Sequence, residues 1–283
     1  MRAILYEESR PADMRDVISK TPIAYVPLGA LEWHGEHGPL GLDGIKARAL
    51  CQEAAGRTGG VVFPAVFWGA FDTMPFPFTL HFKKKELKKL VRRTLDQLGG
   101  WGFKIIVLLT GHYPPTLISM LKKECRRFNK AGGVFAIGAP ETMFATDMGY
   151  YGDHAGMWET SIMMALRPQL VDLSAMPEGL PVMERLEKYG VMGKDPVSKA
   201  SAEKGKEAIE HIVAKLAKTV TKAMDEKSDR AFEEIYESYE KALNIFSPKI
   251  IKTARDALDV RSPGEFLKYA KWNLRNMIFK KNS

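Results

Sequence analysis

Five side chains that can bind a metal ion lie close together in residues 28–44, LGALEWHGEHGPLGLDG: Glu32, His34, Glu36, His37 and Asp43. Glu32 and His34 are two positions apart, and this spacing points both side chains to the same side of an extended segment. Asp43 precedes Gly44 and a helical pattern, so its carboxylate can cap that helix or bridge two metal ions. The stretch predicts one wall of a metal site that other segments must complete.

Two further segments carry residues of the same kind. His112 ends the apolar run FKIIVLLTGH, so a strand end would deliver an imidazole. The segment GDHAGMWETS, residues 152–161, supplies Asp153, His154 and Glu159. Carboxylate and imidazole ligands without thiolates suit zinc, manganese or iron(II), and a bridging carboxylate favours a two-metal site. Such ions lower the pKa of bound water to about 7 and polarise the bond under attack, which is the chemistry of hydrolysis.

The elements that must position these residues alternate along the first part of the chain. We expect strands over residues 21–30, 59–69, 103–112 and 134–140, and helices over residues 44–58, 83–98 and 116–133. The expected strands are apolar at nearly every position, and helices separate them along the chain. This pattern is typical of an α/β fold, in which helices cover both faces of a mostly parallel sheet. Ligands bind such sheets at the carboxyl ends of the strands, which puts residues 28–44 and 110–116 on one rim.

The pattern changes after about residue 165. Residues 167–198 are loop-rich, residues 201–229 form an amphipathic helix, and further helices continue to the end, interrupted at Ser247-Pro248 and Ser262-Pro263. We therefore predict a main domain over residues 1–228 and a C-terminal helical extension over residues 229–283. The extension would pack on the main domain or on another subunit, and its basic, aromatic last segment is expected to dock rather than to lie on a membrane.

Composition excludes several classes of protein. The 283 residues are 45% hydrophobic and 27% charged, typical of a globular protein, and we expect no membrane partner because no apolar run approaches the length of a span. Cys51 and Cys125 each lie in a predicted amphipathic helix, which argues against a disulfide framework. The N-terminus lacks a signal-like apolar region, so the predicted location is cytoplasmic.

The net charge of +8 is concentrated in residues 83–93 and in the C-terminal tail. Within residues 83–98 the apolar side chains recur at helical spacing, which makes the lysines the solvated back of an amphipathic helix: Leu87, Leu90, Val91, Leu95 and Leu98. The chain carries neither a nucleic-acid-binding motif nor a phosphate-binding glycine loop. We expect a small-molecule substrate and no nucleic-acid partner.

The motifs resemble those of the creatininase (creatinine amidohydrolase) family. Its first signature, E-x-H-G-x-H-x-P-L-x-x-D, is matched from Glu32 to Asp43, and the segment FPFTLHF is similar to its F-P-G-T-I segment. A second signature, a strand ending in N-G-H, is matched by residues 110–112, and a third, H-A-G-x-x-E-T-S, by residues 154–161. Three motifs in the family's order are more specific than any one alone.

The resemblance implies a three-layer α/β/α fold and a metal-dependent hydrolase that forms a homo-oligomer, with a hexamer favoured. Carried over by position, the ligands of one metal ion would be Glu32, Asp43 and His112. Asp43 would bridge to a second ion bound also by His34. His154 would be the acid/base residue beside the substrate.

The chain departs from the creatinine-hydrolysing members at the second motif, where Pro114 stands in place of a glutamate that completes the second metal site. We predict that Glu159 supplies this ligand; if it does not reach, the second ion would be weakly held or absent. Thr110 and Pro115 replace the usual Asn and Gly, which makes the loop more rigid. Phe78 replaces the Gly of F-P-G-T and adds bulk near the expected pocket. These departures argue against creatinine itself as the substrate.

The predicted reaction is hydrolysis in which metal-bound hydroxide attacks the carbonyl of a small amide, cyclic amides being favoured. The runner-up is hydrolytic carbon–carbon ring opening of a cyclic diketone derived from inositol, and a different class is a non-catalytic binding protein on the same fold. We expect two divalent ions, zinc, manganese or iron. His37 would support the ligands from behind, and Glu36 would face solvent or a neighbour. Four aromatic residues are predicted to contact substrate, although each could equally belong to the core: Trp33, Tyr113, Phe78 and Trp158.

Overall fold

The computed structural model describes residues 3–69, 71–243, 255, 257–260 and 262–281, with the backbone alone for residue 273 and residues 276–281. Its centre is a five-stranded sheet of order β1-β3-β2-β4-β5 in which every neighbouring pair is parallel. The strands are β1 (Ala3–Leu5), β2 (Ile23–Leu28), β3 (Gly60–Val62), β4 (Ile105–Thr110) and β5 (Phe135–Pro140). The predicted parallel sheet is confirmed.

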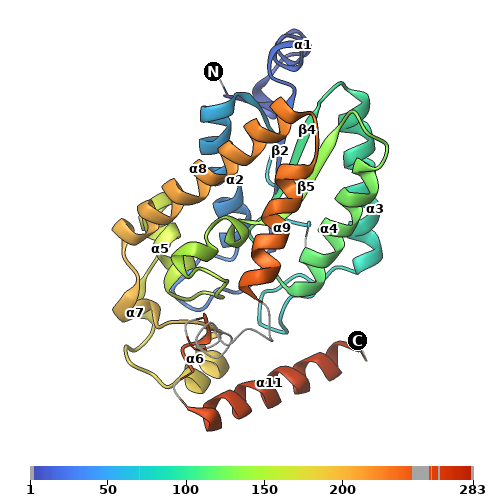
Figure 1. Cartoon of the computed structure of the whole chain (residues 1–283). Helices are drawn as coiled ribbons and strands as arrows, with labels where there is room; N and C mark the ends of the chain where they lie inside the picture. Colours follow the sequence, from blue (N-terminus) through green and yellow to red (C-terminus); the bar gives the residue numbers. More distant parts are fainter. Residues whose placement is uncertain (1–2, 70, 244–254, 256, 261, 282–283) are drawn as a thin grey trace.

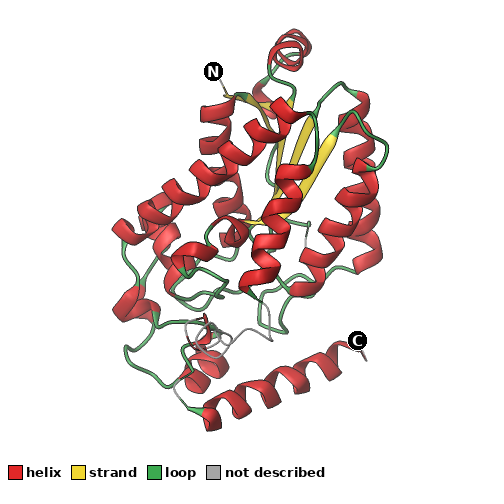
Figure 2. Ribbon diagram, viewed as in Figure 1, coloured by secondary structure: helices red, strands yellow, loops and turns green. Residues whose placement is uncertain are grey.

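Helices cover both faces of this sheet (Figures 1 and 2). Because side chains alternate along a strand, Ile23 and Tyr25 enter one core cluster and Ala24 and Val26 the other. The first cluster is closed by α2 (Leu42–Thr58), α5 (Met157–Leu166), α8 (Ala202–Glu226) and α9 (Arg230–Ala242). The second is closed by α1 (Pro11–Lys20), α3 (Lys84–Gly100) and α4 (Pro115–Asn129). The fold is therefore a three-layer α/β/α sandwich, as predicted.

Helix α3 explains most of the basic run. It buries Leu87, Val91, Leu95 and Leu98 at helical spacing, while its lysines lie on the opposite side. Leu90, which the sequence pattern also assigned to the apolar face, is 54% exposed. The two cysteines are free and buried, Cys51 in one core cluster and Cys125 in the other.

Three segments differ from the sequence-based expectation. The strand expected over residues 59–69 ends at Val62, because Pro64 has no N–H for the ladder; only Val66 forms a further bridge, with Leu28. Strand β1 and helix α1 precede the first expected strand. The segment expected to be loop-rich contains α6 (Val182–Tyr189) and the short α7 (Pro196–Lys199), each beginning at or beside a proline.

Beyond residue 228 the chain forms α9 and α11 (Pro263–Lys281). Helix α9 packs on the sheet, where the buried Tyr236 hydroxyl accepts the backbone N–H of Gly138 at 3.0 Å. Helix α11 lies beside α6, away from the sheet (Figure 1). The predicted break at Ser262-Pro263 is the start of α11, whereas that at Ser247-Pro248 lies outside the described residues. The domain boundary at residue 228 stays a prediction.

Candidate metal centre

The segments after β2 and β4 leave the sheet side by side, because Leu28 pairs with Thr110 at the ends of these strands. The first turn of α2 sits directly against both segments. A Cβ on Gly29 would lie 2.3 Å from the backbone nitrogen of Gly44, and one on Gly111 would lie 2.2 Å from the carbonyl oxygen of Asp43. Only glycine permits this approach, which brings the start of α2 to the rim predicted from the sequence.

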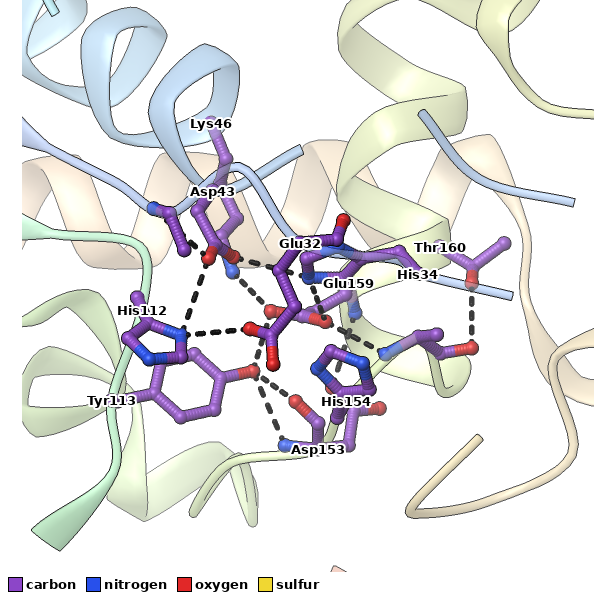
Figure 3. A network of polar contacts seen from close by, with 12 residues as sticks. Glu32, His34, Asp43, Lys46, His112, Tyr113, Asp153, His154, Glu159 and Thr160 are labelled. Carbon is purple, nitrogen blue, oxygen red and sulfur yellow. Dashed lines mark hydrogen bonds and ion pairs between the residues drawn. The ribbon is translucent and has the colours of Figure 1, made fainter. Parts of the chain in front are cut away.

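Asp43 lies between two imidazoles (Figure 3). Its Oδ1 is 3.2 Å from Nε2 of His34, and its Oδ2 is 3.4 Å from Nδ1 of His112. Oδ2 also accepts the backbone N–H of Ala30 at 3.3 Å. The carboxylate does not cap α2, whose capping position is Gly41. Each oxygen thus faces a different imidazole, the arrangement that a bridging carboxylate requires.

His34 and Glu32 present buried lone pairs to the same space. Nδ1 of His34 donates to the carbonyl oxygen of Glu32 at 2.9 Å, which leaves Nε2 without a proton in the neutral ring. This Nε2 and Oε2 of Glu32 are buried and make no hydrogen bond. Oε1 of Glu32 accepts the backbone N–H of Met74 at 3.0 Å, and Oε2 lies 3.1 Å from Nδ1 of His112. Buried atoms of this kind that converge without forming a hydrogen bond fit a cation.

Glu159 reaches the cluster from the first turn of α5. Its Oε1 accepts hydrogen bonds from Nζ of Lys46 and from the hydroxyl of Tyr113, each at 2.7 Å. Its Oε2 accepts the backbone N–H of Ala155 at 2.8 Å and lies 3.6 Å from Nε2 of His34. The carboxylate is thus fixed on one side and turned toward His34 on the other. Glu159 therefore reaches the cluster, while its role as substitute for the glutamate absent at Pro114 stays a prediction.

The described residues contain three groups of three side chains, and within each group the ligand atoms lie within 4.8 Å of one another. Two of them share Asp43, and the third adds His154: Glu32, Asp43 and His112; His34, Asp43 and Glu159; Glu32, His34 and His154. Carboxylates and imidazoles in groups of three suit zinc, manganese or iron. The donor set therefore fits the divalent ions expected from the sequence.

Charges in the cluster favour a cation. Burial opposes ionisation of Glu32, but the imidazoles of His112 and His154 lower its pKa to about 2. Burial would likewise lower the pKa of His34, yet Asp43 and Glu159 raise it to about 9. The pKa of His112 is raised to about 10, against burial, by Glu32 and Asp43. The carboxylates that hold protons on these rings would equally hold metal ions in their place.

His154 is held on the other side of the cluster. Its Nε2 donates to the carbonyl oxygen of Trp33 at 2.9 Å, and its backbone pairs with that of Met192. Its ring stacks on Phe76, with centroids 5.5 Å apart. Burial and the nearby His34 lower its pKa, which keeps the ring neutral. In a neutral imidazole whose Nε2 carries the proton and donates it to Trp33, Nδ1 is the nitrogen that can accept a proton.

His37 lies behind these residues. Its Nε2 donates to the carbonyl oxygen of Ala155 at 3.0 Å and lies 3.1 Å from the Thr160 hydroxyl. Burial lowers its pKa to about 4, so the ring is neutral. Ala155 follows His154 in the chain and donates its backbone N–H to Glu159. By bonding to Ala155, His37 therefore helps to position both His154 and Glu159. Glu36, its neighbour, is exposed.

A cavity of about 550 Å³ opens beside the cluster. Of the four aromatic residues predicted to contact substrate, Tyr113 is among its lining residues. The Trp33 ring is buried against Phe76, with centroids 5.3 Å apart, and Trp158 stacks on Tyr150 at 5.3 Å. Phe78 is 79% exposed. These three are not among the described residues that line the cavity, and their contact with substrate stays a prediction.

The family model described as creatinine amidohydrolase matches residues 7–220. The chain belongs to the creatininase family. It is accordingly an enzyme, a metal-dependent hydrolase of the amidohydrolase type. The resemblance drawn from the three motifs is confirmed. Within the described residues no helix is both long enough and apolar enough to cross a membrane.

Two curated proteins and a solved structure illustrate the relationship. The chain is 27% identical over 235 residues to creatinine amidohydrolase of Pseudomonas putida, covering 70% of this chain and 88% of that protein. It is 22% identical over 261 residues to 3-dehydro-scyllo-inosose hydrolase of Thermotoga maritima, covering 78% and 84%. A structure named "Creatininase Mn" is 25% identical, with a TM-score of 0.65, and covers 78% of this chain and 98% of that one.

Four residues near the creatininase-type site were not found from the sequence. Lys46 lies three positions after Asp43 and therefore on the same side of α2, a spacing that could have indicated it. Glu141 follows β5 as His112 follows β4, so the strand-end rule could have found it. Leu258 and Tyr269 line the cavity from beyond the family model. No sequence pattern indicated these two residues, because their position at the cavity depends on how the C-terminal segment folds back onto the main domain.

Proposed function

We propose that this chain is a two-metal hydrolase that cleaves a small amide at its carbonyl carbon, cyclic amides being favoured. The observation that carries the proposal is the position of Asp43, with one oxygen toward His34 and the other toward His112. One ion would be held by Glu32, Asp43 and His112, and the other by His34, Asp43 and Glu159. Zinc, manganese or iron(II) bound there would acidify water to a pKa of about 7 and polarise the substrate carbonyl.

His154 would move the protons. Because Nε2 donates to the Trp33 carbonyl, Nδ1 is the atom that can accept a proton from the attacking water. The lowered pKa of His154 keeps the ring neutral and ready to accept this proton at pH 7. The same Nδ1 would then donate to the leaving nitrogen, which must be protonated before the carbon–nitrogen bond breaks. The stacked Phe76 and the bond to Trp33 hold the ring in one orientation for both steps.

A second candidate is hydrolytic carbon–carbon ring opening of a cyclic diketone derived from inositol. The similarity to 3-dehydro-scyllo-inosose hydrolase, over 78% of this chain, favours it. The same residues would serve, since water again attacks a carbonyl and His154 would protonate a leaving carbon in place of nitrogen. The two candidates differ in the substrate and not in the ligands.

Metal content and a substrate screen test the proposal. We expect near-stoichiometric manganese, zinc or iron in the purified protein, and turnover of a cyclic amide, a formamide or a cyclic diketone in a screen with each metal. His154→Ala should keep its metal and lose about 100-fold or more in kcat. His211→Ala, at a half-buried histidine on α8, is the matched control and should retain activity. Protein that binds no transition metal would instead be a non-catalytic binding protein on this fold.

We further infer from the family that the protein is a cytoplasmic homo-oligomer, with a hexamer favoured. The mass of the purified protein in solution, measured by light scattering, tests the oligomeric state. A monomer at micromolar concentration would contradict it.

A further inference from the structure

The C-terminal extension reaches the metal cavity. Leu258, in the segment before α11, and Tyr269, within α11, line the cavity together with the ligand residues. The match to the family model ends at residue 220, so both residues lie outside the part of the chain that the family model describes. The part of the cavity lining that they form, called the C-terminal wall below, therefore comes from outside the matched region.

A buried ion pair holds the wall in place. Nη2 of Arg185, on α6, lies 2.8 Å from Oδ2 of Asp259, the neighbour of Leu258. Arg185 is 1% exposed and also donates to the carbonyl oxygens of Leu180 and Gly193, each at 2.8 Å. A guanidinium with this many buried partners fixes the backbone beside Leu258.

The extension also contacts the two residues that brace His154. The hydroxyl of Tyr269 donates to Sδ of Met192 at 3.6 Å, and Met192 pairs with the backbone of His154. The ring of Trp272 lies 6.3 Å from that of Phe76, which stacks on His154. The wall thus approaches the site on the side of His154.

The side chains that line the cavity differ in charge and polarity. The ionisable side chains that face the cavity are carboxylates and imidazoles besides the two tyrosines, with no lysine or arginine among the described residues that line it. Lys46 is behind Glu159 and fully buried. The apolar part of the lining includes Met74, Met192 and Leu258. A phosphate would meet no lysine or arginine on this lining, and the hydroxyls of a polyol placed against these apolar side chains would lose their hydrogen bonds to water.

We propose that Leu258 and Tyr269 determine the substrate, which is a neutral or cationic amide with an apolar ring or chain attached near its carbonyl. The inference rests on the proposed metal-dependent hydrolysis and deepens it, because it selects the amide class over the polyhydroxylated diketone. The apolar group would pack against Leu258 and the ring of Tyr269 while the carbonyl faces the ligand cluster. Binding energy at this wall would orient the carbonyl for attack.

Hydroxamates can distinguish the contribution of the wall to binding from that of the metal site, because they share one metal-chelating group and differ in the group attached to it. We would measure binding of acetohydroxamate, benzohydroxamate and gluconohydroxamate to the manganese-loaded full-length protein by calorimetry. The wild type should bind benzohydroxamate about tenfold more tightly than acetohydroxamate, since the ring is buried at the wall. Tyr269→Ala and Leu258→Ala should each remove about three- to tenfold of this preference and leave acetohydroxamate binding within about twofold.

Leu267→Ala is the control, because Leu267 lies in the same helix and is 56% exposed. It should change neither affinity. If Tyr269→Ala unfolds, as judged from its melting temperature, the hydroxamate preference of Leu258→Ala still tests the role of the wall. An unchanged preference in the folded variants, or tighter binding of gluconohydroxamate than of benzohydroxamate, would overturn the wall assignment alone. Failure of the manganese-loaded wild type to bind acetohydroxamate would overturn the proposed function, and the substrate assignment with it.

Discussion

Nζ of Lys46 lies 2.7 Å from Oε1 of Glu159, and both side chains are buried. The same ammonium lies 2.5 Å from Oε1 of Glu141. Burial raises the pKa of Glu141 to about 7, although the charge of Lys46 opposes this rise. One buried lysine thus forms ion pairs with two buried carboxylates. The other oxygen of Glu159 faces His34 in the ligand cluster. This fixes the side chain of Glu159, whose role as a metal ligand stays a prediction.

Replacing Lys46 with methionine should destabilise the protein by about 3–5 kcal/mol, because two buried carboxylates lose their counter-charge. The free energy of unfolding in urea measures the effect, with Lys218→Met, an exposed lysine on α8, as the control. Adding Glu141→Gln to Lys46→Met should restore part of the loss, since one uncompensated charge is removed. A loss below about 1 kcal/mol in the single variant would contradict this role for Lys46.

Metal stoichiometry should separate the two proposed positions. Glu159→Gln affects only the proposed position formed by His34, Asp43 and Glu159, so we expect the bound manganese, measured by elemental analysis, to fall from two ions toward one per chain. Asp43→Asn affects both groups and should remove both ions. It should also abolish the rise in thermal stability on adding manganese, which for the wild type is about 2.7 kcal/mol at 100 times Kd. Retention of two ions by Asp43→Asn would rule out a bridging carboxylate.

Gly111 is predicted to be intolerant of a methyl group. Its Cβ would lie 2.2 Å from the backbone oxygen of Asp43, so Gly111→Ala must push α2 away from β4 and separate Asp43 from His112. We expect a loss of about 1–3 kcal/mol in unfolding free energy and loss of metal. Gly56 is exposed in the same helix with nothing within 4 Å of a Cβ, so Gly56→Ala should stabilise by about 0.5–1 kcal/mol. Equal effects of the two substitutions would refute the argument.

The sequence predicted the parts of this architecture that depend on short-range pattern. Buried runs and helical periodicity identified β2, β4 and their helices, and the strand-end rule then put Asp43 and His112 on one rim. The third motif suggested Glu159 as the substitute ligand, and the structure brings its Oε2 to 3.6 Å from Nε2 of His34, while the role itself stays a prediction. The spacing from Asp43 indicates the side of α2 on which Lys46 lies, but it does not show that the side chain is fully buried, because a lysine in an amphipathic helix normally faces water.

The C-terminal wall could not be predicted for a different reason. The place of Leu258 and Tyr269 depends on contacts made across the chain, such as that of Asp259 with Arg185. No periodicity encodes such contacts, and the family match ends before them. Phe78 illustrates the converse: its motif position suggested the pocket, but the loop turns its side chain to solvent, where it is 79% exposed.

The pH dependence of stability should report on Glu124, which joins α3 to α4 far from the proposed ligands. Its carboxylate is 1% exposed and accepts two hydrogen bonds from Arg92, at 2.6 and 3.2 Å, and one from Arg127 at 3.1 Å. Burial opposes its ionisation, but the hydrogen bonds and charges of these arginines lower its pKa below the usual value. A carboxyl group with a lower pKa in the folded than in the unfolded chain binds fewer protons when folded, so its contribution to stability is lost in acid.

This contribution should be complete above the unfolded pKa of glutamate, about 4.3, and should vanish as the pH falls through the lower folded value. Glu124→Gln should therefore cost about 1 kcal/mol at pH 7, a modest figure because the arginines are partly exposed and water screens them. The difference in unfolding free energy between wild type and variant, measured in urea from pH 7 down to pH 3, should shrink toward zero at the acid end. A difference that stays constant over this range would mean that Glu124 acts through packing, and that its lowered pKa contributes nothing to the joint between α3 and α4.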